Sequence, residues 1–157
     1  MLRKVLYGVG VVGLGLSTAP LIGFANAISP TILPTALGLT IALFGGASLA
    51  AYSMPKDSLL SYGRILGGGL LGLIGLQLAG IGSVFFFGAN PIATMLMSTT
   101  TYMAVGLFTA MIAYDTHYAI KMYEEQLPDH LSVATNFLLD FWNILTSLLR
   151  IFSSDSD

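Results

Sequence analysis

The 157-residue sequence contains no cysteine. This absence excludes disulfide bonds, thiol nucleophiles and cysteine-based metal sites, although it says nothing about the compartment. Charged side chains are also scarce, at 9% of the sequence, against about 25% in soluble domains. The chain has a net charge of −2 and no basic patch, so we exclude nucleic acid as a partner.

The remaining composition is apolar, because hydrophobic residues make up 55% of the chain. Residues 5–55 and 65–114 contain no Asp, Glu, Lys or Arg. A membrane-spanning helix needs about 20 apolar residues, so each stretch holds a pair of helices, and a fifth apolar segment follows. The sequence predicts an all-α, polytopic membrane helix bundle in one domain, lying in a lipid bilayer, with five transmembrane helices at about 5–25, 31–52, 64–87, 92–114 and 131–152.

The fourth predicted helix is expected to continue as an interfacial helix over residues 115–126, which Pro128 ends. The apolar N-terminal stretch is longer than the 7–15 residues of a typical signal-peptide core, so we expect it to be retained as a helix. No Arg-rich, acid-poor presequence is visible.

Basic residues are concentrated in three regions: the N-terminus, the loop that leads into the third predicted helix, and the segment after residue 114. The first region holds Arg3 and Lys4, the second Lys56 and Arg64, and the third Lys121. These regions share one membrane face if the first four helices each cross. The positive-inside rule assigns that face to the cytoplasm or the mitochondrial matrix. If the last helix spans, Arg150 emerges on the opposite face. If that helix dips in and returns, Arg150 stays on the basic face.

Asp140 lies well inside the last apolar segment, and Asp115 closes the preceding one. A charge deep in a bilayer is costly and usually has a partner or a function. Because a helix end, a turn and a return helix fit between the two acids, we expect them to face each other. Such a pair does not easily ionise twice, so it would share a proton or bind a hard cation such as Ca²⁺ through oxygen. The alternatives are an interfacial acid at Asp115 and a locally paired acid at Asp140.

Three further polar residues accompany the acids. Asn143, three residues after Asp140, shares its helical face and is expected to support that carboxyl group. His117 titrates near neutral pH, but an interfacial role competes with a supporting one. Arg150 is expected to reach lipid phosphate from the membrane edge, with a gating role as the alternative.

Catalytic patterns are missing from the sequence. It has no Ser-His-Asp arrangement, no phosphate-binding loop and no metal-ligand spacing. We therefore expect no enzyme and no resident cofactor.

The third predicted helix is rich in glycine. Gly68 and Gly72 form a small-xxx-small pair that Gly75 extends. Such rows let helix backbones approach closely. We interpret this row as packing within the chain, with a contact between two chains as the alternative.

Several segments resemble the transmembrane Bax inhibitor motif family. Ala113-Tyr114-Asp115-Thr116 resembles the end of its penultimate helix, and Asp140-Phe141-Trp142-Asn143 followed by Arg150 resembles its last helix. Leu16-Ser17-Thr18-Ala19-Pro20 resembles its third helix. Gly45-Gly46-Ala47-Ser48, with Ala51 and Pro55, resembles its fourth, closest to the mitochondrial branch called growth-hormone-inducible transmembrane protein.

The resemblance implies a truncated version of a seven-helix bundle whose last helix is central, with Asp115 and Asp140 as a pH-sensing, cation-binding pair. It also implies a mitochondrial inner-membrane location and a role in Ca²⁺/H⁺ leak or exchange. This sequence differs from the family pattern in lacking the first two helices, including a basic residue that can latch the acids. His117 stands where the family usually has Gln, and the loop before the last helix is short.

Two functions of different classes follow. The first is a protein that passes or senses Ca²⁺ and H⁺ through the acid pair. The second is a non-catalytic accessory subunit of a large inner-membrane assembly, such as a respiratory-chain complex, in which other membrane subunits replace the missing helices.

Overall fold

The computed structural model describes residues 2–126 and 129–155. Over these residues the chain forms α1 (Leu2–Ile28), α2 (Ile32–Ser53), the short 3₁₀ helix η1 (Leu60–Tyr62), α3 (Gly63–Phe87), α4 (Pro91–Glu124) and α5 (His130–Ser154). No strand occurs in this part of the chain. The predicted all-α class is confirmed, and the five long helices correspond to the five predicted ones. Pro128, where we expected the interfacial helix to end, lies outside the described residues.

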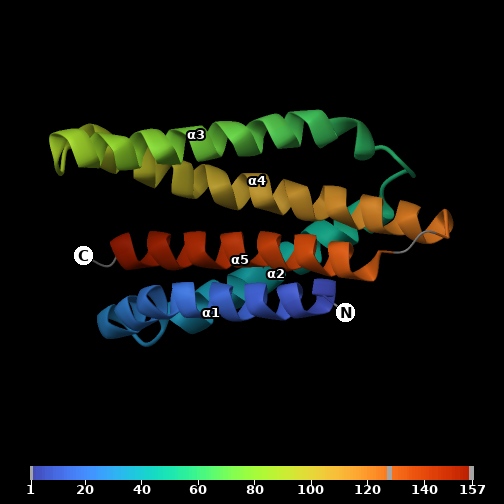
Figure 1. Cartoon of the computed structure of the whole chain (residues 1–157), viewed down its shortest axis with the longest axis horizontal. Helices are drawn as coiled ribbons and strands as arrows, with labels where there is room; N and C mark the ends of the chain where they lie inside the picture. The colour runs from blue at the N-terminus through green and yellow to red at the C-terminus, as the bar shows by residue number, and fades with distance from the viewer. Residues whose placement is uncertain (1, 127–128, 156–157) are drawn as a thin grey trace.

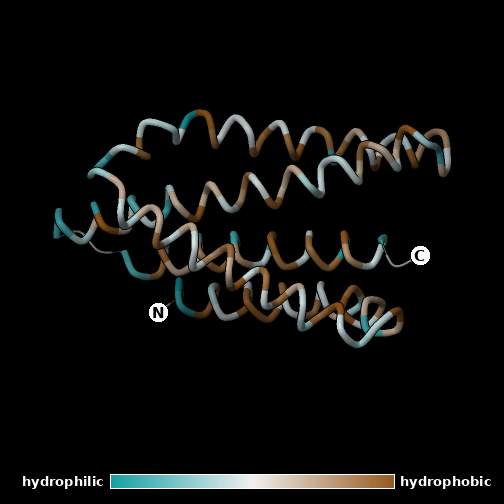
Figure 2. The backbone as a smooth tube through the Cα atoms, turned by 180° about the vertical axis from the view of Figure 1, so that it is seen from behind, coloured by the Kyte–Doolittle hydropathy of each residue, from teal (hydrophilic) through white to brown (hydrophobic). Residues whose placement is uncertain are grey.

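Successive long helices run in opposite directions along one axis (Figure 1). The N-terminus, the α2–α3 connection and the α4–α5 connection therefore lie at one end of the bundle, called here the loop end. The α1–α2 and α3–α4 turns and the end of α5 lie at the opposite end. Figure 2 shows hydrophobic colours along much of the helices and hydrophilic colours around the loop end.

Four segments of the described chain are long and apolar enough to cross a membrane: Leu2–Ile28, Ile32–Ser53, Leu60–Phe87 and Pro91–Glu124. α5 is a continuous helix that runs alongside them without turning back (Figure 1). Arg150 therefore lies toward the end opposite the basic loops. Because α5 carries polar residues along its length, its crossing of the membrane stays a prediction.

Local sequence explains how α4 and α5 begin. The Asn90 side chain accepts a hydrogen bond from the Ala93 N–H at 2.8 Å, and Pro91 follows at the first helical position, where its missing N–H is harmless. Asp129 caps α5 in the same way through the Ser132 N–H at 3.2 Å. Gly88 has a φ of +71°, a value that glycine adopts without strain, so the chain can turn from α3 into α4.

The core lies around α5, which contacts α4, α2 and α1. Ile112, Ile144 and Leu149 are completely buried there. Phe44 of α2 packs edge-on against Phe137, with ring centroids 5.5 Å apart. α1 and α3 are the least enclosed long helices, each with two buried residues: Thr18 and Ala25 in α1, and Leu73 and Gly80 in α3.

The glycine row of α3 requires a correction. A Cβ atom at Gly68, Gly72 or Gly75 would meet nothing within 4 Å, so this face does not pack within the described chain. The close approach occurs on the neighbouring faces of α3. A Cβ atom at Gly69 would lie 3.1 Å from Leu107, and one at Gly80 would lie 3.3 Å from Met97. Sequence spacing identified a small-residue helix but not which of its faces meets α4.

Candidate functional site: a buried carboxyl pair

Asp115 lies on the buried face of α4 because of helical periodicity. The buried residues of this helix include Ala104, Phe108, Ile112 and Asp115, at spacings of four and three that align side chains on one face. The aspartate therefore extends an apolar stripe. Its side chain is buried, and the residue is only 7% exposed.

Asp140 likewise lies on the buried face of α5. It begins a run of buried residues that continues through Ile144 and Leu148. Asp140 is 2% exposed, less than Asp115. Antiparallel α4 and α5 thus present one carboxyl group each to their shared interface.

The two carboxyl groups face each other closely enough to interact, and the Asn136 side chain lies beside Asp115 as well. An ionised carboxylate only accepts hydrogen bonds, so two carboxyl groups bond directly only when one of them holds a proton. The Oδ2 atom of Asp140 is buried and finds no hydrogen-bond partner within the described residues. Leaving such an atom unpaired is costly, so this position favours a proton or a cation.

The pair is not a complete metal cage. The residues that the structure describes contain no group of three or more His, Asp or Glu side chains able to hold a metal ion. Ca²⁺ takes six to eight oxygen ligands, so the two carboxyl groups and the Asn136 amide oxygen would supply only some of them. The arrangement therefore suits transient binding better than permanent coordination.

Asn136 was missed by sequence reasoning, which chose Asn143. The Asn143 amide instead donates to the Leu139 carbonyl of its own helix at 2.8 Å. Asn136 lies four residues before Asp140 and so shares its helical face. Helical spacing places Asn136 and Asn143 equally well beside Asp140, so it does not decide which of the two reaches the pair.

His117 also lies in an unexpected environment. It is buried, and its Nε2 atom lies 2.6 Å from the carbonyl oxygen of Ala51 near the end of α2. Since a carbonyl only accepts, Nε2 carries the hydrogen. The Nδ1 atom is buried without a partner in the described part of the chain. His117 thus joins α4 to α2, and it forms no hydrogen bond to the acid pair within the described residues.

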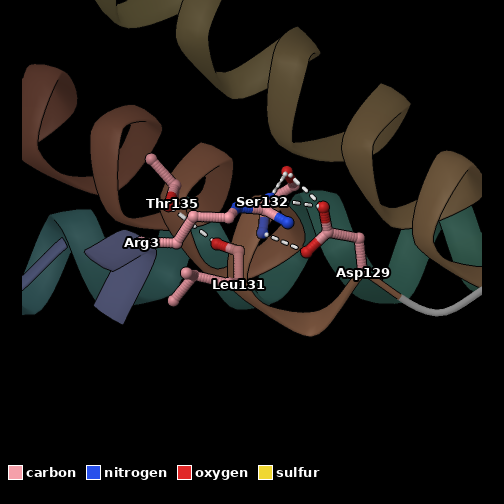
Figure 3. A network of polar contacts seen from close by, with 5 residues as sticks. All are labelled: Arg3, Asp129, Leu131, Ser132 and Thr135. Atoms are coloured by element: carbon pink, nitrogen blue, oxygen red, sulfur yellow. Dashed lines mark hydrogen bonds and ion pairs between the residues drawn. The ribbon is translucent and has the colours of Figure 1, made fainter. Parts of the chain in front are cut away.

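The loop end is held by ion pairs that connect distant segments. Arg3 donates to Asp129 at 2.6 Å, and the Ser132 hydroxyl donates to the same carboxyl group at 3.0 Å (Figure 3). Hydrogen bonds from Arg3, and then from Ser132, lower the pKa of Asp129 to about 2. Lys56 pairs with Glu124, and that hydrogen bond raises the pKa of Lys56. These contacts connect α1 to α5 and the α2–α3 loop to α4.

Comparisons with known proteins bear on the family of this chain. The family model described as "Inhibitor of apoptosis-promoting Bax1" matches residues 1–157. An uncharacterized protein of Caulobacter vibrioides is 31% identical over 156 residues, which cover 95% of this chain and 57% of that protein. No solved structure matches the chain significantly.

Two further relatives with assigned names are similar to this chain. Human Bax inhibitor 1 is 28% identical over 137 residues, covering 87% of this chain and 54% of that protein. The inner membrane protein YbhL of Escherichia coli K12 is 30% identical over 151 residues, covering 90% and 58%. The chain therefore spans little more than half the length of these relatives. Because the family model covers the whole sequence, this chain is an integral membrane protein that belongs to the Bax inhibitor family.

Proposed function

We propose that the Asp115–Asp140 pair is a proton-sensitive cation site, through which the protein leaks or exchanges Ca²⁺ and H⁺ without catalysing a reaction. The observation that carries the proposal is the meeting of two buried carboxyl groups, one with an unpartnered oxygen. A proton and a divalent cation compete for such oxygens, because each neutralises the repulsion between the two acids.

Burial supports a gated site rather than an open one. Ile112 and Ile144, one turn from the acids on α4 and α5, are completely buried. Cation passage therefore requires α4 and α5 to separate. Loss of the shared proton would favour that separation, because two ionised carboxylates repel each other at close range.

The experiment is a flux assay on the full chain in liposomes that contain a Ca²⁺-sensitive dye. We expect wild-type flux to rise with pH and Asp140→Asn to abolish this pH dependence. Glu125→Gln is the matched control, because it removes one exposed carboxylate and leaves the pair intact. Unchanged flux in the Asp140→Asn protein would contradict the proposal.

The membrane in which this happens belongs to the proposal as well. The mitochondrial inner membrane, with the basic loops in the matrix, is the location that the resemblance to the mitochondrial branch favours. The names of the relatives support only the coarser location, since one of them is an inner membrane protein of E. coli. Fractionation of the source cells with a protease-protection assay on the loop end would test it.

The structural alternative is favoured by one observation. Arg3, Tyr7, Leu14, Ser132 and Asn136 line part of a groove of about 700 Å³ between α1 and α5, and relatives are nearly twice as long. A chain from another subunit could fill this groove. Extraction in mild detergent, followed by native gel electrophoresis and mass spectrometry, distinguishes the functions. A large stoichiometric complex favours the accessory subunit, whereas migration alone or as a small oligomer favours the cation site.

A further inference from the structure

A second polar groove lies between α3, α4 and α5, toward the end opposite the loops. It measures about 620 Å³, and the residues that matter for its chemistry are Gln77, Ile81, Met97, Ser98, Arg150 and Asp155. Arg150 follows Asp140 by ten residues, about 15 Å along an α-helix. Buried Ile144, Leu145, Leu148 and Leu149 occupy α5 between the two positions. The groove is therefore separate from the carboxyl pair.

The charges of this groove come from α5 and the residue that follows it. Residues 65–114 supply no charged side chain, so α3 and α4 contribute only uncharged ones here. Arg150 is exposed and takes part in no salt bridge among the described residues. Asp155 is exposed as well and lines the same groove. One cation and one anion thus share a groove without forming a salt bridge to each other.

Uncharged hydrogen-bonding groups accompany the two charges. The Gln77 amide and the Ser98 hydroxyl both line the groove. Neither side chain forms a hydrogen bond within the residues that the structure describes, so both are available to a ligand. The Thr101 hydroxyl, by contrast, already donates to the Met97 carbonyl at 2.7 Å.

Apolar side chains border the same groove on the membrane-spanning helices. Ile81 is 57% exposed and Met97 is 45% exposed. Phe85, Phe86 and Phe87 are exposed at the adjacent end of α3, and exposed aromatic residues are typical of the membrane–water interface. A ligand for this groove therefore needs a polar head that carries both charge signs and an apolar body that continues along α3 and α4.

We infer that the groove binds a glycerophospholipid whose headgroup joins a phosphodiester to a primary ammonium group. Arg150 holds the phosphodiester, because a guanidinium matches phosphate oxygens with several donors. Asp155 accepts hydrogen bonds from the ammonium group, and the acyl chains lie over Ile81 and Met97. A purely anionic ligand fits less well, because the Asp155 carboxylate repels it.

Native mass spectrometry of the full chain in mild detergent tests this site. The probes are phosphatidylethanolamine, phosphatidylcholine, phosphatidylglycerol and inorganic phosphate. We expect phosphatidylethanolamine to be retained best. Arg150→Ala should lower its retention about tenfold, the order expected for loss of a charge-assisted hydrogen bond, and Arg150→Lys should restore part of it. Asp155→Asn should remove the preference over phosphatidylcholine and phosphatidylglycerol.

Matched controls lie at the loop end. Arg64→Ala and Asp57→Asn remove the same charges from exposed positions and should leave lipid retention unchanged. Equal retention in the groove variants and these controls would overturn the inference, as would wild-type preference for phosphatidylglycerol. Displacement of the lipid by inorganic phosphate would assign the groove to free phosphate instead. Asp155 lies after the end of α5, so its variant tests the site even if Arg150→Ala fails to fold.

Discussion

At the loop end of the bundle, the Asp129 side chain is 33% exposed and lies 2.6 Å from a guanidinium nitrogen of Arg3. Inside the bundle, Asp140 is 2% exposed and its nearest charged neighbour is a second carboxyl group. The negative charge of Asp129 is balanced by Arg3 and is partly exposed to solvent, so its ionised form is stable. The charge of Asp140 has neither compensation, so a proton or a bound cation is required to neutralise it. Both residues are aspartates, so residue type does not distinguish the structural contact from the candidate site. Burial and the sign of the neighbouring charge do.

The largest expected effect concerns the buried acids. Asp115→Asn removes one of two competing charges and should reduce the pH dependence of Ca²⁺ flux at least tenfold, because the remaining carboxylate no longer meets a like charge. The measurement is liposome flux between pH 6 and 8. Asp57→Asn is the exposed control, and an equal loss in both variants would erase the distinction between the two regions.

The next effect concerns His117, a buried polar contact outside the acid pair. His117→Ala should destabilise the protein by about 0.5–1.5 kcal/mol, because the buried Ala51 carbonyl loses one of its two donors and keeps only the Met54 N–H. His117→Gln should lose less, since an amide N–H also donates to a carbonyl. Unfolding in mixed micelles measures both variants. Equal stability of wild type and His117→Ala would show that this contact contributes nothing.

The next prediction compares alanine substitutions at two glycines of α3, one on a face packed against α4 and one on an open face. A Cβ atom at Gly63 would lie 2.8 Å from the Tyr114 hydroxyl, whereas one at Gly72 would meet nothing. Gly63→Ala should cost about 1–2 kcal/mol of stability. Gly72→Ala should be neutral or stabilising by up to about 1 kcal/mol, because alanine favours helix. Thermal unfolding in detergent compares them, and a destabilised Gly72→Ala protein would point to a contact made by that face with another chain.

The smallest expected effect belongs to the exposed ion pair. The pKa of Asp129 is lowered to about 2, so its stabilisation is complete above the unfolded value near 4 and is lost as pH falls through about 2. Wild type and Asp129→Asn should therefore differ in melting temperature at about pH 6 and converge below about pH 2. A difference that persists below that pH would assign the effect to the α5 cap instead.

Much of the fold could be anticipated from composition and periodicity. The uncharged stretches 5–55 and 65–114 implied paired helices, and four of the observed helices are apolar enough to span. The prominence of Asp140 also followed from the chain, because a carboxylate within an apolar segment demands an explanation. These inferences succeed because both features depend on residues close together in the sequence. A helix forms from neighbouring residues, and its buried side chains recur about every 3.6 residues.

The contact partners of these side chains could be identified only from the tertiary structure. Helical spacing placed Asn143 near Asp140, yet Asn136 reaches the pair. Likewise, Gly69 rather than Gly68 meets its neighbour, and His117 binds a carbonyl 66 positions away. Such contacts depend on the rotation of each helix about its axis and on how closely it approaches the next. Packing between distant segments decides both, and no local pattern records them.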